Sequence, residues 1–189
     1  MIKVLGISGS LRRGSYNTAL LRAATKLMPE DSTLEVASIR GIPLYDGDVE
    51  AQGIPAAVGA LKEAVVAAAG VLLVTPEYNN GIPGVFKNTI DWLSRPNSDA
   101  RRVFGGRPFA LIGASPGGFG TTLSQAAWLP VLRTLGTQFW SGGRLQVSRA
   151  AAVFDESGNL KDSGVEEQLK KFLAGYVAFV ERASSATAL

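Results

Sequence analysis

Three apolar runs in this chain lack the polar residues at alternate positions that mark a half-exposed strand. They cover residues 4–7 (VLGI), 70–75 (GVLLVT) and 108–114 (PFALIGA), and each leads directly into a polar loop. A strand without alternation is typical of a parallel sheet covered by helices on both faces. Apolar residues at helical spacing follow each loop, which predicts that strands and helices alternate along the chain.

This alternation predicts a doubly wound α/β fold. Further strands are expected at residues 34–39 and near residues 145–148, and Pro55 is expected at the first position of a helix. Five strands and five helices in 189 residues fit one flavodoxin-like domain over residues 1–189. Its parallel sheet would have the order 2-1-3-4-5, with helices on both faces. Only the tail at residues 184–189 (SSATAL) is expected to fray.

The polar loops after the first, third and fourth strands are expected to meet at one edge of this sheet. In doubly wound sheets, ligands bind beyond the carboxyl ends of the strands, at the switch point between the first and third strands. One polar loop could occur by chance, but three loops at the correct edge predict a ligand site.

The first of these loops, residues 8–15 (SGSLRRGS), suits a single phosphate ester. Free backbone amides and the dipole of the following helix attract an anion there. Ser10, Ser15 and Asn17 are candidate neutral donors, and Arg12 is a candidate charged donor. The G-x-G-x-x-G dinucleotide spacing is not met, and no G-K-[ST] triplet occurs in the chain. The alternative is a polar turn in which Ser or Asn caps the helix.

The second loop, residues 76–83 (PEYNNGIP), is stiffened by two prolines and can present backbone groups to the edge of a flat heterocycle. Tyr78 is a candidate to cover an aromatic ring, and Asn79 is a candidate to hydrogen-bond its polar rim. The alternative is that Glu77, Tyr78 and Asn79 are solvated turn residues.

The third loop, residues 115–122 (SPGGFGTT), allows the backbone to approach a ligand closely, with Phe119 at its side. Glycine-rich turns of this kind also occur without a ligand. No second carboxylate pairs with Glu77 in the sequence, so no carboxylate dyad for acid–base catalysis is predicted.

The chain contains no histidine and no cysteine. This excludes the commonest general base, the usual zinc and haem ligands, thiolate nucleophiles and Ser-His triads. No metal site is predicted, and a difficult reaction would depend on a bound cofactor. The formal charge of +3 is too small and too scattered to indicate nucleic-acid binding. No apolar run has the length of a membrane span and no signal peptide is visible, so a cytoplasmic protein is expected.

These motifs resemble the NADPH-dependent FMN reductase family, whose members include bacterial chromate, quinone and azo-dye reductases. The resemblance rests on residues 6–17 (GISGSLRRGSYN), 75–95 (TPEYNNGIPGVFKNTIDWLSR) and 154–160 (FDESGNL), and it covers nearly the whole chain. It implies bound FMN, NADPH or NADH as hydride donor, no catalytic side chain, and a homodimer or homotetramer. The implied cofactor-binding residues are Ser10, Arg12, Ser15, Tyr16, Asn17, Pro76, Glu77, Tyr78, Asn79, Ser115, Gly117 and Gly118.

Residues 121–133 (TTLSQAAWLPVLR) depart from the family pattern. The family often places basic residues and a histidine in this stretch, whereas this chain has Trp128 and Pro130. The resemblance therefore extends to the flavin site but not to polar contacts between subunits or to the acceptor pocket.

The predicted function is an oxidoreductase that passes hydride from NAD(P)H through FMN to a small-molecule acceptor. Quinones, free flavins, azo compounds and metal oxyanions such as chromate are the candidate acceptors. A flavodoxin-like FMN electron carrier that serves protein partners is the alternative, and nothing in the sequence favours a third class, a ligand-binding regulatory module. Arg101, Arg102 and Arg107 are candidates for the 2′-phosphate of NADPH, with solvated loop arginines as the alternative.

Overall fold

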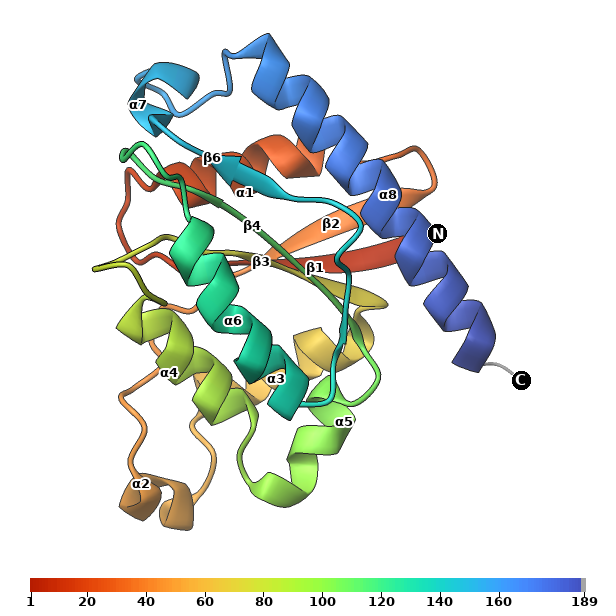
Figure 1. The fold of residues 1–189 in the computed structure, drawn as a ribbon. Coiled ribbons are helices and arrows are strands. Elements are labelled where there is room, and N and C mark those ends of the chain that lie inside the picture. The colour runs from red at the N-terminus through yellow and green to blue at the C-terminus, as the bar shows by residue number, and fades with distance from the viewer. Residues whose placement is uncertain (188–189) are drawn as a thin grey trace.

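The computed structural model describes residues 1–187, which form a six-stranded parallel sheet between two layers of helices (Figure 1). β1 (Ile2–Ser8) lies between β2 (Ser32–Ala37) and β3 (Gly70–Val74), and β4 (Pro108–Ala114) follows β3. Every strand pairing is parallel. The order β2-β1-β3-β4-β5 confirms the predicted doubly wound, flavodoxin-like arrangement.

Alternate residues of the central strands enter two separate cores. Leu72 and Val74 of β3 pack on the side of α1 and α8, whereas Val71 and Leu73 pack on the side of α3, α4 and α6. Burial on both faces explains why the apolar runs show no alternation. The helices are α1 (Tyr16–Lys26), α2 (Gly47–Gln52), α3 (Ala56–Ala67), α4 (Gly84–Leu93), the 3-10 turn η1 (Asn97–Asp99), α5 (Ala100–Phe104), α6 (Thr122–Thr134), α7 (Ala150–Val153) and α8 (Ser163–Thr187).

Two short strands occupy the position where the sequence predicts a single fifth strand. β5 (Gln138–Phe139) pairs with the start of β4, and β6 (Leu145–Val147) pairs with its end. Only the second was predicted, near residues 145–148, because a strand of two residues is too short to leave a periodic pattern. The chain between them carries Trp140, whose ring packs edge-on against Phe172 of α8.

Three further details differ from the prediction. Pro55 caps α3 instead of occupying its first helical position. The short helices α2, α5 and α7 were not predicted, since none is long enough to show a helical period. α8 continues to Thr187, so residues 184–187 are helical instead of frayed, and residues 188–189 lie outside the described part of the chain. Among the helices of residues 1–187, none has both the length and the apolarity needed to cross a bilayer.

The carboxyl ends of three strands lead into loops at the same edge of the sheet, as predicted (Figure 1). We name them L1 (residues 9–15, after β1), L2 (residues 75–83, after β3) and L3 (residues 115–121, after β4). Because β1, β3 and β4 are consecutive in the sheet, L1, L2 and L3 are neighbours in space.

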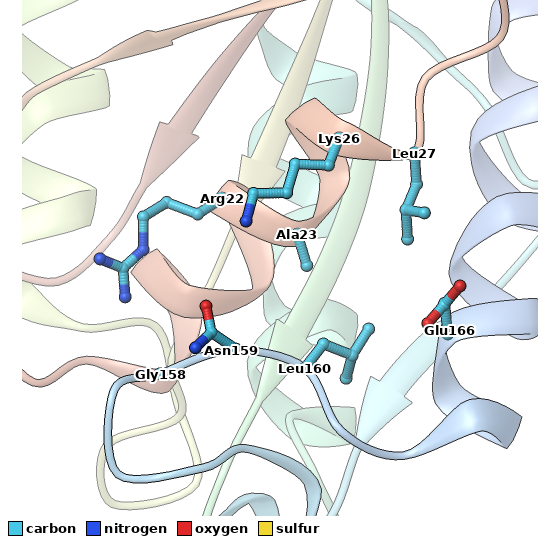
Figure 2. A pocket seen from close by; sticks show the side chains of 8 residues that line it. All are labelled: Arg22, Ala23, Lys26, Leu27, Gly158, Asn159, Leu160 and Glu166. Atoms are coloured by element: carbon cyan, nitrogen blue, oxygen red, sulfur yellow. The ribbon is translucent and has the colours of Figure 1, made fainter.

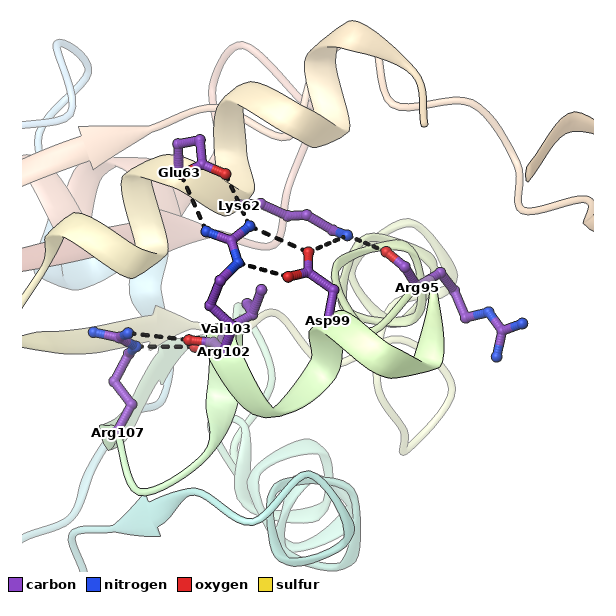
Figure 3. A network of polar contacts seen from close by, with 7 residues as sticks. All are labelled: Lys62, Glu63, Arg95, Asp99, Arg102, Val103 and Arg107. Carbon is purple, nitrogen blue, oxygen red and sulfur yellow. Dashed lines mark hydrogen bonds and ion pairs between the residues drawn. The ribbon is translucent and has the colours of Figure 1, made fainter. Parts of the chain in front are cut away.

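A network of charged groups holds α5 against α3 (Figure 3). Lys62, which is 3% exposed, donates to the carbonyl of Arg95 and to Asp99 Oδ2, the latter at 3.0 Å. Arg102 pairs with Asp99 Oδ1 at 2.6 Å and with Glu63 Oε1 at 2.9 Å. Hydrogen bonds from Arg102 and Lys62 stabilise the charged form of Asp99 and lower its pKa from 3.8 to about 2.

This network predicts a contribution to stability that acid removes. The pKa of Asp99 is lower in the folded than in the unfolded chain, so the contribution is complete above pH 4 to 5 and is lost as the pH falls from about 4 to about 2. Asp99→Asn should lower the free energy of unfolding at pH 7 by about 1–2 kcal/mol, because the lost hydrogen bonds are charged but partly exposed. Urea unfolding of both proteins at pH 7, 4 and 2.5 measures this. The free energy of unfolding should fall less between pH 7 and pH 2.5 in Asp99→Asn than in the wild type. An equal fall in both proteins would contradict the assignment of this stabilisation to Asp99.

Candidate functional site

L1 presents backbone N–H groups at the N-terminus of α1. Its first residue, Gly9, donates to the carbonyl of Val74 and so attaches L1 to the end of β3. Within residues 1–187, the amides of residues 13–16 have no hydrogen-bond partner. Free amides at the positive end of a helix dipole are a preformed anion site. This arrangement fits the phosphate of a mononucleotide.

Cationic side chains stand beside these amides. Arg12 and Arg13 are both exposed, and neither guanidinium has a hydrogen-bond or ion-pair partner in the part of the chain that the structure describes. A pocket of about 400 Å³ opens beside L1, between these arginines, Arg22 of α1 and the turn at residues 155–158. Arg12 is therefore free to meet a phosphate, and that contact stays a prediction.

The side chains of Ser15 and Asn17 have partners within the protein. Ser15 caps α1, since its hydroxyl accepts from the amides of Asn17 and Thr18 at 3.2 and 3.4 Å. Asn17, which is 4% exposed, donates from Nδ2 to the carbonyl of Ala114 at 2.8 Å and accepts at Oδ1 from the Ala114 amide at 2.9 Å. We expected the Asn17 carboxamide at the phosphate, whereas the structure directs it to the end of β4. Ser15 keeps its own hydroxyl proton, so its contact with a phosphate stays a prediction.

Ser10 and Tyr16 also make local contacts. The Ser10 hydroxyl accepts from the Arg12 amide at 3.3 Å, which shapes L1. The Tyr16 ring stacks on Phe154 with a centroid distance of 5.9 Å. Phe154 begins the turn that the sequence singled out as FDESGNL, where Asp155 Oδ1 accepts from the Asn159 amide at 2.7 Å. Tyr16 thus attaches this turn to the start of α1.

L2 contains a tight hairpin at residues 78–81. The amide of Tyr78 donates to the Gly81 carbonyl at 3.1 Å, and the Gly81 amide donates back at 3.0 Å. Asn79 and Asn80 have φ of 49° and 61°, a left-handed conformation that asparagine tolerates well. A turn at these residues, which the sequence analysis gave as the alternative to a ligand contact, is therefore present. Tyr78 lies at the base of this hairpin and is 51% exposed, so its ring is free to cover a ligand.

Glu77 joins L2 to L3. Its Oε2 accepts from the amides of Leu123 and Ser124 at 2.8 and 2.9 Å. These amides belong to the first turn of α6, whose own N-cap residue Thr121 makes no side-chain capping bond. Glu77 was expected at the edge of a flavin; its carboxylate caps α6, and a contact between its backbone and a flavin stays a prediction. Pro76 is buried beneath it.

L3 is open on its outer side. The Ser115 hydroxyl accepts from the Gly117 amide at 3.2 Å and so bends the loop. A Cβ added to Gly118 would meet no heavy atom within 4 Å, and one added to Gly117 would meet only Ser115 Oγ. Phe119 is 84% exposed. L3 therefore offers a low wall of backbone, as expected for Ser115, Gly117 and Gly118 beside a flat ligand.

The three arginines considered for a 2′-phosphate lie elsewhere. Arg102 pairs with Asp99 and Glu63, and Arg107 donates to the backbone carbonyls of Val103 and Arg102 (Figure 3). Arg107 also donates to the carbonyl of Ala68. Arg107 directly precedes β4, so it lies at the edge of the sheet opposite L1, L2 and L3. Arg101 borders a pocket that contains none of the loop residues. Within this chain, the structure thus removes these arginines from the predicted ligand site.

The two residues at which this chain departs from the family pattern, Trp128 and Pro130, differ in their burial. Trp128 is fully buried, whereas Pro130 is exposed within α6. A second pocket, of about 280 Å³, lies beside the later turns of α1 (Figure 2). None of its lining residues belongs to L1, L2 or L3. They are Arg22, Ala23, Lys26, Leu27, Gly158, Asn159, Leu160 and Glu166.

Comparisons with known proteins agree with this fold. The family model described as NADPH-dependent FMN reductase matches residues 2–152. An NAD(P)H-dependent FMN reductase of Pseudomonas aeruginosa is 44% identical over 181 residues, covering 96% of each chain. A 2-hydroxy-1,4-benzoquinone reductase of a Burkholderia species is 35% identical over 95% of this chain and 96% of its own. The solved structure of a flavoenzyme NAD(P)H:acceptor oxidoreductase from Paracoccus denitrificans has a TM-score of 0.86 and 32% identity, covering 97% of this chain and 99% of its own.

Arg12 and its neighbour Arg13 provide a matched pair for testing the phosphate site. Arg12→Ala should weaken FMN binding by about 1.5–3 kcal/mol, the range for hydrogen bonds to a charged group. Arg13→Ala removes the same charge from the adjacent position and should cost clearly less. Titration of the cofactor-free protein with FMN, followed by flavin fluorescence, measures both. Equal losses would indicate general electrostatic attraction and would contradict a specific contact by Arg12.

Proposed function

The chain belongs to the NADPH-dependent FMN reductase family, and from this premise we propose that it reduces quinones with NAD(P)H through FMN held between L1, L2 and L3. It is an enzyme of the NAD(P)H-dependent FMN reductase and quinone reductase type, with FMN as cofactor. The observation that carries the proposed site is the unused set of L1 amides, which lies at the one edge where three loops meet. Relatives that are named quinone reductases support the choice of acceptor.

The described residues fit this cofactor. The amides of residues 13–16, with Arg12 and the hydroxyls of Ser10 and Ser15, would hold its phosphate. The backbone of L2 and the Tyr78 ring would hold the isoalloxazine, and the glycines of L3 would leave room above it. When bound, FMN takes a hydride from NAD(P)H and returns reducing equivalents to the acceptor.

The protein's own part in this reaction is placement. The chain has no histidine or cysteine, and the Glu77 carboxylate is occupied by two backbone amides. No acid or base therefore stands out among the loop residues. Hydride transfer between stacked rings depends on distance and orientation, which rigid loops supply. An electron carrier would not need room above the flavin, so the open outer side of L3 favours the reductase over the carrier.

Free flavins, azo compounds and chromate are further acceptors that we propose from the resemblance. We also propose that residues 1–189 act as a single cytoplasmic domain that forms a homodimer or homotetramer. Two observations support this part. The sheet and both cores draw on elements from all along the described chain. Apolar side chains are exposed in the three loops and at the start of α6, and they are Leu11, Tyr78, Phe119 and Leu123.

The proposed activity can be tested without knowing the physiological acceptor. Under anaerobic conditions NADPH or NADH should bleach the absorbance of bound FMN within seconds, and a benzoquinone should restore it. The physical reason is that an open ring face allows the nicotinamide to stack for hydride transfer. Dithionite reduces any accessible flavin and serves as the positive control. Bleaching by dithionite alone, with both nicotinamide nucleotides inactive for many minutes, would support the carrier instead. Repeating the restoring step with chromate or an azo dye tests those acceptors.

A further inference from the structure

We propose that Glu77 and Trp128 are positioning residues, which fix the backbone of L2 to α6 so that L2 meets the flavin in one conformation. Neither side chain is assigned a contact with the cofactor. The inference rests on the proposed function, because it takes L2 as a loop that faces FMN. It is carried by a set of hydrogen bonds that ties Thr75 and Glu77 of L2 directly to α6, and Pro76 to α6 through Thr75.

The first connection is made by the buried Thr75 hydroxyl, whose proton and both lone pairs take part in hydrogen bonds. The Trp128 indole donates from Nε1 to Thr75 Oγ1 at 3.1 Å, and the Ser124 hydroxyl lies 2.9 Å from the same oxygen. Thr75 Oγ1 donates its single proton to the Pro76 carbonyl at 2.9 Å. A hydroxyl has one proton and two lone pairs, so Ser124 and Trp128 fill both acceptor positions. Thr75, Ser124 and Trp128 are all completely buried.

This arrangement sets the direction of the Pro76 carbonyl. Thr75 has a single proton, and all three contacts are satisfied together only when that proton goes to the Pro76 carbonyl and Ser124 donates to Thr75. A buried network in which every member is satisfied is rigid, since any rotation leaves a polar group unpaired. The first peptide of L2 is thereby oriented by two side chains of α6.

The second connection is the cap that Glu77 provides. Its carboxylate accepts from the amides of Leu123 and Ser124, at the positive end of the α6 dipole. The dependence is mutual, because α6 receives no side-chain cap from its own N-cap residue. The hairpin at residues 78–81 follows Glu77 directly, so the bonds of Glu77 to α6 determine where the hairpin lies relative to the sheet.

Trp128 also supports L1. Its ring packs edge-on against Phe86 of α4, with centroids 5.1 Å apart. A Cβ built on Gly9 would lie 2.1 Å from Phe86 Cδ1, so Phe86 touches the backbone of L1 directly. The Trp128 ring therefore supports both loops: it reaches L1 through Phe86 and L2 through its hydrogen bond to Thr75. This gives a structural role to the residue at which the sequence departs from the family pattern.

The chain offers a matched control in Trp92. Trp92 is also completely buried, donates from Nε1 to a backbone carbonyl, that of Pro43, at 2.9 Å, and packs edge-on against Tyr45. Trp128→Phe and Trp92→Phe therefore remove the same group from equally buried sites. Only the first should loosen L2.

The decisive readout uses cofactor-free protein. Hydrogen–deuterium exchange of the amides at residues 78–82 should be faster in Trp128→Phe and Glu77→Ala than in the wild type, and unchanged in Trp92→Phe. The FMN dissociation constant should rise about 5- to 10-fold in Trp128→Phe and Glu77→Ala, as expected for one lost hydrogen bond. Glu77→Gln keeps an oxygen acceptor for α6 and should restore most of the affinity.

The outcomes separate this inference from the proposed function. Failure of the wild type to bind FMN would refute the proposed function, while the exchange data would still decide whether Glu77 and Trp128 hold L2. If the wild type binds FMN but Trp128→Phe and Glu77→Ala match Trp92→Phe in exchange and affinity, the positioning roles are wrong. Should Trp128→Phe not fold, Glu77→Ala, which truncates only a loop side chain, decides the question.

Discussion

Two hydrogen bonds between the Asn17 carboxamide and the backbone of Ala114 hold the ligand edge of this protein together. Asn17 is the second residue of α1, which follows β1, and Ala114 ends β4; in the sheet, β3 separates β1 from β4. The bonds therefore reach across the end of β3 and fix L1 relative to L3. Both groups are buried, so removing the carboxamide would leave a backbone donor and a backbone acceptor unpaired, which is more costly than losing an exposed hydrogen bond. The separation of the two loops is thus set before any ligand arrives.

Close contacts beneath the loops extend this constraint to L2. Gly113 of β4 lies so near its neighbours that an added Cβ would be 2.2 Å from both the Thr75 carbonyl and Thr121 Oγ1. Gly9 is in equally close contact with Phe86. Each contact brings a strand end or loop of one βα unit against a residue of another, and only glycine permits it. Because a packed interior resists small displacements, the three loops behave as one surface.

The sequence predicted the elements that its local patterns encode, and failed where distant contacts decide. Apolar runs identified β1, β3 and β4, and with them the edge at which the loops meet. The partners of Asn17 and Glu77 could not be predicted in the same way, because they lie 97 and 46 residues away in the chain. An asparagine can donate to a phosphate and a glutamate can accept from a flavin edge, and the same polar groups also cap helices and pair with the backbone. Residue type alone does not separate these roles. The two-residue strand β5 was missed for a different reason, since it has no period to detect.

The polar groups at this edge have two roles: some, such as Asn17 and Glu77, hold the loops together, and others stay available to a ligand. Asn17 and Glu77 bond to neighbouring elements. Within residues 1–187, the groups that stay available to a ligand at this edge include the amides at residues 13–16, the Arg12 guanidinium and the exposed Tyr78 ring. These are the groups that suit a phosphate and an aromatic ring, and none of them is a strong acid or base. A reaction that passes hydride between two stacked rings needs accurate placement more than proton transfer by a side chain. A chain without histidine or cysteine can meet that need, provided that its loops are held by bonds that no ligand has to supply.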